Sequence, residues 1–145
     1  MQRDENKQSR PENVILFEES ARLQELKKQA EIEHLKELYS ITKNGTLKKY
    51  KGSERVVTIP EGVTRIGCQA FESNAFIENV ILSETVEVIE ESAFKYCNHL
   101  KRAVLPSCLK QIEQYAFFHC EELEDIVLPD SLTDIGAFAF SHCSK

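Results

Sequence analysis

Histidine and cysteine, the side chains of this sequence best suited to metal or redox chemistry, recur together at a fixed spacing. His119-Cys120 and His142-Cys143 are separated by 23 residues, and His99 follows Cys97 by two. A metal site needs three or four converging ligands. We expect each cysteine to point inward and the neighbouring histidine outward, because successive side chains of an extended segment face opposite ways. The pattern therefore predicts no metal site and no cofactor.

The cysteines also raise the question of disulfide bonds. Cys97, Cys120 and Cys143 share the 23-residue spacing. If that spacing is a structural repeat, their Cα atoms would lie within the roughly 4.4 to 6.8 Å that a disulfide spans. The chain has five cysteines, an odd number, and none stands in a Cys-x-x-Cys pair. This favours buried free thiols over disulfides and a reducing, intracellular location.

No catalytic motif accompanies these residues. The sequence contains no glycine-rich phosphate loop, no nucleophile elbow and no His-Glu-x-x-His helix. Glu90-Glu91 and Glu121-Glu122 are adjacent carboxylates, which we expect on solvated loops rather than as an acid–base pair. We therefore expect that the protein is not an enzyme.

Composition and charge exclude further classes. Hydrophobic residues make up 41% and charged residues 29% of the 145 residues, as in soluble globular proteins. The net charge of -6 is concentrated in residues 46–145, with 10 basic and 15 acidic side chains, so no nucleic acid is expected as a partner. The longest apolar run, residues 14–17, is too short for membrane insertion. With no signal peptide in view, we expect a cytoplasmic location, or the cell surface if the chain is a fragment.

The N-terminal region precedes the repeats and divides into three segments. Residues 1–13 are polar and predict a disordered tail. Residues 14–38 predict a helical segment, with strong helix formers from Glu18 and Ser20 as its N-cap. Because its apolar residues form two offset stripes, this helix either packs on the end of the repeats or binds a partner. Residues 39–53 predict a capping β-hairpin, since Asn44-Gly45 favours a type I′ turn.

Residues 54–145 consist of four copies of one 23-residue unit, numbered here from Leu100 as position 1. Positions 6, 10, 13, 18 and 21 each repeat one residue type or a close substitute. They are Ile59, Leu82, Leu105, Leu128; Val63, Val86, Leu109, Leu132; Ile66, Ile89, Ile112, Ile135; Phe71, Phe94, Phe117, Phe140; and Asn74, Cys97, Cys120, Cys143. This agreement indicates a solenoid, in which each turn, or rung, stacks on the next.

Stacking gives each position of the unit a structural role. Positions 4 and 6 are expected to face inward from a short parallel strand. The proline of position 7 ends that strand because it has no N–H to donate. Positions 10 and 13 add inward residues from a second extended segment, and position 18 places a phenyl ring in the core. The first rung would expose unpaired backbone groups, which the predicted hairpin would cover.

The unit resembles the BspA-like leucine-rich repeat family, which has the same Leu/Ile-Pro, Ile, Ala-Phe and Cys landmarks at this length. The resemblance covers about residues 39–145, with Glu54 and Asn74 of the first copy and Ser83 of the second departing from the pattern. It implies a role in protein contact or adhesion. The predicted fold is an α+β repeat protein: a leucine-rich-repeat-like, right-handed β-solenoid with short parallel strands, an N-terminal helix and a β-hairpin cap.

Position 5 is the strand residue expected to point away from the core, and it suggests where a protein partner binds. Its four residues are Thr58, Ile81, Val104 and Val127, and its charged neighbours include Lys101, Arg102, Glu124 and Asp125. An apolar centre with a polar rim suits a binding face. The alternative is that Ile, Val and Thr simply favour strands. We therefore expect a non-enzymatic protein-protein interaction module. The alternatives are a fragment of a longer array, a surface adhesin, or end-to-end self-association through the last rung.

Overall fold

The computed structural model describes residues 11–145, which form two units: a helical unit that extends to Leu35, and a β-solenoid over Lys36–Lys145. The helix α1 spans Glu12–Leu38. It begins earlier than predicted, because the Pro11 carbonyl accepts the N–H of Val14 at 2.9 Å and proline favours the start of a helix. The prediction of Ser20 as N-cap is therefore wrong. Most of the predicted tail, residues 1–13, lies outside the described residues, but residues 12 and 13 are helical.

No residue of α1 is buried. Its apolar side chains are accessible over much of their surface, with exposed fractions of 74% for Phe17, 54% for Leu23 and 62% for Leu26. Among the described residues, no helix combines the length and the apolar character needed to cross a membrane.

A β-hairpin follows the helix, as predicted. Strand β1 (Tyr39–Ile41) pairs antiparallel with β2 (Thr46–Tyr50). The predicted type I′ turn is wrong: Gly45 has a φ of +81°, but Asn44 is absent from the residues with positive φ. The Gly45 N–H donates to the Thr42 carbonyl at 3.0 Å. The single positive φ fits a longer hairpin loop with a bulge at its glycine.

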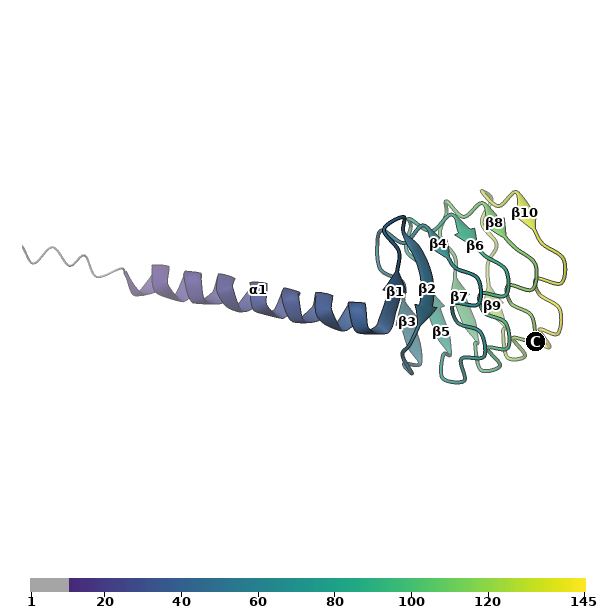
Figure 1. Cartoon of the computed structure of the whole chain (residues 1–145), viewed down its shortest axis with the longest axis horizontal. Coiled ribbons are helices and arrows are strands. Elements are labelled where there is room, and N and C mark those ends of the chain that lie inside the picture. The colour runs from purple at the N-terminus through teal and green to yellow at the C-terminus, as the bar shows by residue number, and fades with distance from the viewer. Residues whose placement is uncertain (1–10) are drawn as a thin grey trace, which may run out of the picture. The chain divides into compact units, whose positions relative to one another are not determined.

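Two sheets form two sides of the solenoid, and their strands pair in parallel except for the antiparallel pair of β1 and β2 (Figure 1). The first contains β3 (Val56–Thr58), β5 (Asn79–Ile81), β7 (Arg102–Val104) and β9 (Asp125–Ile126), in that order. The second has the order β1-β2-β4-β6-β8-β10, with β4 (Arg65–Ile66), β6 (Val88–Ile89), β8 (Gln111–Ile112) and β10 (Asp134–Ile135). Because β2 pairs with β4 in parallel and β1 pairs with β2, the hairpin adds two strands in front of the first rung. The predicted hairpin cap is confirmed.

The third side of each rung is a turn, and in the first three rungs this turn hydrogen-bonds to the next rung. Positions 16 and 20 have a positive φ in every rung, although none of them is glycine: Gln69, Ser73, Ser92, Tyr96, Tyr115, His119, Phe138 and His142. Their N–H groups point along the solenoid, as shown by Tyr96, which donates to the Phe118 carbonyl at 2.8 Å. The left-handed conformation therefore pairs backbone groups that would otherwise remain unsatisfied in a turn.

The core consists of ladders formed by the repeated positions. Phe71, Phe94 and Phe117 are at most 1% exposed, and their rings stack at centroid distances of 4.8 and 5.1 Å. Tyr50 of the hairpin stacks on Phe71 at 5.0 Å and so extends the same column. The last rung is less covered, since Leu128 is 44% and Ile135 50% exposed.

Candidate functional site

The outer face of the β3-β5-β7-β9 sheet carries the residues predicted to bind a partner. Four side chains of position 5, here called the position-5 strip, lie on it: Thr58, Ile81, Val104 and Val127. Strand pairing places the first three directly beside one another. Position 4 points into the core, where Val57, Val80 and Ala103 are at most 2% exposed. Alternation along each strand therefore turns position 5 outward, with exposed fractions of 39% for Ile81, 44% for Val104 and 77% for Val127.

Charged side chains flank the strip at positions 2 and 3 and pair between rungs. The carboxylate of Glu78 lies 3.6 Å from the Arg55 guanidinium and 3.5 Å from the Lys101 ammonium. Arg102 donates a hydrogen bond to Asp125 of the next rung. These pairs are solvent-exposed, so each contributes at most about 1 kcal/mol to stability. Because opposite charges pair, these side chains place little net charge beside the strip.

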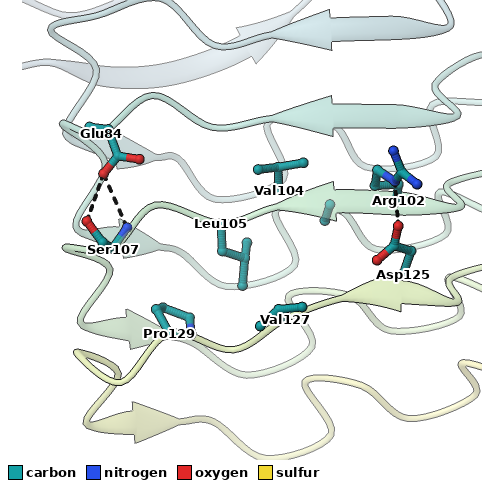
Figure 2. Close-up of a pocket in the computed structure, with 9 residues that line it drawn as sticks. Glu84, Arg102, Val104, Leu105, Ser107, Asp125, Val127 and Pro129 are labelled. Atoms are coloured by element: carbon teal, nitrogen blue, oxygen red, sulfur yellow. Dashed lines mark hydrogen bonds and ion pairs between the residues drawn. The ribbon is translucent and has the colours of Figure 1, made fainter.

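A shallow depression of about 480 Å³ lies where the strip crosses β7 and β9. Figure 2 shows the side chains that line it. Val104, Leu105 and Val127 lie in its middle (Figure 2). At one end, Glu84 accepts hydrogen bonds from the N–H of Ser107 at 3.2 Å and from its hydroxyl at 3.0 Å. The ion pair of Arg102 and Asp125 stands at the other end. The arrangement is an aliphatic surface held between two polar contacts.

A second depression of about 480 Å³ lies at the start of the same strands. It is lined by Asn79, Lys101, Arg102, Glu124 and Asp125. The two depressions together contain six of the eight residues that the sequence singled out; Thr58 and Ile81 lie outside both.

Sequence reasoning missed five residues that line the first depression: Glu84, Ala103, Leu105, Ser107 and Pro129. Leu105 was expected in the core as a position-6 residue. It is only half-buried, because the equivalent Leu128 of the next rung is itself exposed. Pro129 stands at position 7, and Glu84 and Ser107 stand at position 8 of their rungs. Only strand stacking reveals that this corner after position 6 borders the strip.

The cysteines of position 21 form a buried column rather than a reactive site. The Sγ atoms of Cys97, Cys120 and Cys143 donate to carbonyls of the preceding rung at 3.1 to 3.2 Å. All three are free thiols, and Cys97 and Cys120 are fully buried. Burial raises the pKa of Cys97 to about 12 and raises the pKa of Cys120 as well. These thiols remain protonated near neutral pH and, besides filling space as predicted, act as weak donors.

The histidines lie at the surface. The rings of His119 and His142 stack with a centroid distance of 4.2 Å. His99 Nδ1 lies 3.1 Å from Glu122 Oε1 and donates a hydrogen bond to this carboxylate, which lowers the pKa of Glu122. Within residues 11–145, no group of three or more His, Cys, Asp or Glu side chains is placed to hold a metal ion.

Glu90 has a structural role that the sequence analysis did not predict. Its carboxylate accepts hydrogen bonds from Arg65 at 2.6 Å and from the Cys68 N–H at 2.9 Å. Glu113, one rung later, likewise accepts the Glu91 N–H at 2.9 Å. The expectation that Glu90 is merely solvated is wrong, because position 14 bonds to a backbone donor of the preceding rung.

Comparison with known families identifies the repeat. The model of the BspA type leucine-rich repeat region matches residues 42–145 in 6 copies. The match starts before Glu54, where sequence analysis placed the first full unit, because β2 and its loop already act as part of a rung. No curated protein matches the sequence.

Solved structures of bacterial leucine-rich repeat proteins share the fold. A leucine-rich repeat protein of T. pallidum is 26% identical with a TM-score of 0.62, over 72% of this chain and 64% of that one. A leucine-rich cell surface protein of Faecalibacterium prausnitzii is 35% identical with a TM-score of 0.65, over 72% of this chain and 32% of its own. A protein from Bacteroides capillosus is 30% identical with a TM-score of 0.60, over 67% and 80%. The chain thus spans less than two thirds of the first two.

Proposed function

Because the chain belongs to the BspA-type leucine-rich repeat family, we propose that it is a non-enzymatic module that binds a protein through the outer face of the β3-β5-β7-β9 sheet. The position-5 strip supports this proposal, since three of its four side chains, Ile81, Val104 and Val127, are exposed and aliphatic, and ion pairs border them. Apolar centres with polar rims are typical of protein interfaces. Strand propensity alone accounts for Ile and Val at position 5, but not for the depression between β7 and β9.

The depression supports a specific mode of contact. An aliphatic or aromatic side chain of the partner would enter between Val104 and Val127 and displace water from their exposed surfaces. The Arg102 and Asp125 pair at its edge offers hydrogen-bonding groups that would orient the partner. Most of the binding energy is therefore expected from rungs three and four, where the aliphatic surface is most exposed.

A surface adhesin, or a fragment of a longer repeat array, is the alternative form of this proposal. It is supported by the similar structure from Faecalibacterium prausnitzii, which is described as a cell surface protein. In such an array the same sheet face would continue along further rungs and bind a larger partner surface.

A single charge in the strip tests the proposal. Val104→Glu should abolish partner capture, because it places a carboxylate in the middle of the depression. The free energy of unfolding should change by less than about 0.5 kcal/mol, since the side chain is exposed. The measurement is a quantitative pulldown with tagged protein, analysed by mass spectrometry and followed by binding of the purified partner.

Ile41→Glu is the matched control, because Ile41 is 42% exposed on a strand of the other sheet. Partners retained by the wild type and by this control, but lost with Val104→Glu, would support the proposal. The same partners captured by all three proteins would contradict it. So would a loss of stability equal to the loss of binding, which would show that Val104 belongs to the core.

Self-association is a second candidate, favoured by the surface of the fourth rung. Leu128 is 44% and Ile135 50% exposed, whereas their equivalents Ile59 and Ile112 in earlier rungs are 1% exposed. A further rung or a second copy would cover this surface. Association of two copies through the fourth rung is therefore an alternative to binding through the strip.

A further inference from the structure

A second cluster of exposed and half-buried side chains lies on the turn side of the solenoid, away from the strip. It is here called the aromatic patch and contains Lys95, Tyr96, Tyr115, Phe118, His119, Phe138 and His142. Tyr96 is 42% and Phe138 59% exposed. The rings contact one another across three rungs, with Tyr115 stacked on Phe138 at 5.5 Å and His119 on His142 at 4.2 Å. Phe118 meets both histidines edge to face.

The rung geometry does not require these rings. Tyr96, Tyr115, His119, Phe138 and His142 stand at positions 16 and 20 with φ between 57° and 63°. Tyrosine and phenylalanine rarely adopt such values. The first rung has the same φ values with Gln69 and Ser73, two small or polar side chains. The aromatic residues are therefore an addition of the later rungs. Because their positive φ strains the backbone and their side chains reach the surface, they suggest a function other than stability.

The patch is also distinguished by its charge. The Lys95 ammonium lies 5.2 Å from the ring centroid of Tyr96, 5.5 Å from Tyr115 and 5.8 Å from Phe118. Within the part of the chain that the structure describes, no carboxylate pairs with Lys95, whereas Lys101 and Lys110 each pair with a glutamate of the preceding rung. In a protein of net charge -6, this leaves a cation without a counterion amid apolar rings.

The other polar groups of the patch favour the same kind of ligand. Stacking covers ring faces, so ring edges, which bear the positive end of the quadrupole, make up much of the accessible surface. The two imidazoles and the tyrosine hydroxyls add hydrogen-bond donors. One carboxylate already uses this chemistry: Glu121 Oε1 lies 3.4 Å from His119 Nδ1. Donors, positive ring edges and an ammonium that contacts rings but no carboxylate together suit an anionic group.

We infer that the aromatic patch is a second binding surface, which takes an acidic peptide segment of a partner protein. A glutamate or aspartate of the segment pairs with the Lys95 ammonium, and a neighbouring carboxylate accepts from the imidazoles of His119 and His142. The aliphatic stems and backbone of the segment pack on Phe118 and Tyr96. Charge selects the segment, and the rings exclude water around the ion pair, which strengthens it.

The test measures fluorescence anisotropy of a fluorescein-labelled peptide of alternating glutamate and glycine, with glutamine replacing glutamate in the neutral control peptide. The acidic peptide should bind the wild type, more weakly at high salt, and the neutral peptide should not. Lys95→Gln should weaken binding by roughly tenfold, because it removes the charged partner. Lys95→Arg should retain it.

Lys110→Gln is the matched control, because Lys110 is also exposed but pairs with Glu87 on another side of the solenoid. Its effect on binding should stay below about twofold. Equal effects of Lys95→Gln and Lys110→Gln, or equal binding of the neutral peptide, would overturn the inference. Val104→Glu should leave acidic-peptide binding unchanged, so this surface and the position-5 strip can fail independently.

Discussion

The phenyl column offers the most direct test of how rungs hold together. Phe94 is fully buried and stacks on Phe71 at 4.8 Å and on Phe117 at 5.1 Å. Phe94→Ala should reduce the free energy of unfolding by about 3–5 kcal/mol, the usual loss for a buried phenylalanine. Domains of this size are stable by only about 5–15 kcal/mol. The variant should therefore be close to unfolding, as measured by urea denaturation followed by circular dichroism.

Phe140 is the matched control, since it occupies the same position in the fourth rung. It is half-buried and has a single ring neighbour in the column, Phe117 at 5.2 Å. Because stability in a solenoid is approximately a sum of rung and nearest-neighbour terms, Phe94 contributes to two interfaces and Phe140 to one. Phe140→Ala should cost about 1–3 kcal/mol. Equal losses for the two variants, or a loss below about 1.5 kcal/mol for Phe94→Ala, would refute this reasoning.

Two further predictions concern the thiol column and the fourth rung. Burial raises the pKa of the Cys97 thiol from 9.0 to about 12, so this thiol ionises at a lower pH in the unfolded chain than in the folded one. The free energy of unfolding should therefore be highest below about pH 9 and should fall as the pH rises toward 12. In Cys97→Ala, the free energy of unfolding, measured by urea titration, should fall less steeply with pH, by up to about 1.4 kcal/mol per pH unit. An unchanged dependence on pH would contradict the assignment of this decline to Cys97. For the fourth rung, association between copies predicts a sedimentation coefficient that rises with protein concentration and that Ile135→Lys returns to the monomer value. A monomer at every concentration would exclude this candidate.

Much of the fold could be predicted because the repeat carries redundant information. A residue that recurs every 23 positions must occupy the same place in each rung, and apolar identity then assigns it to the core. Ile66, Ile89 and Ile112 follow this rule and are at most 1% exposed. The hairpin was also predictable from Asn44-Gly45, although its turn type was not, since several loops accept that pair.

Other features were missed because they break the period. Tyr50 joins the phenyl column, but it lies three residues after Leu47, whereas Phe71 lies five after the equivalent Ile66. No interval of 23 therefore reveals it. The start of α1 was also misplaced, because Ser20 looked like a cap while the Pro11 carbonyl already accepted the first helical hydrogen bonds.

The candidate site was predicted only in part. Alternation along a strand identified the position-5 strip, which is a local property of the chain. The depression is lined partly by Leu105 and Pro129, which lie in the corner that follows position 5. The aromatic patch depends on the positive φ of positions 16 and 20. Neither can be read from residue types, because Tyr and Phe are not residues in which a left-handed conformation is expected.

The sequence alone determined the period, the family resemblance, the core ladders and the outward position of the strip. These follow from residue types at fixed intervals, because a residue at a given position of the repeat is buried or exposed in the same way in each rung. Only the tertiary structure decided which surface residues meet, since residues 23 apart become neighbours when rungs stack and their side-chain directions depend on backbone φ. That geometry places Lys95 among three rings and Arg102 beside Asp125.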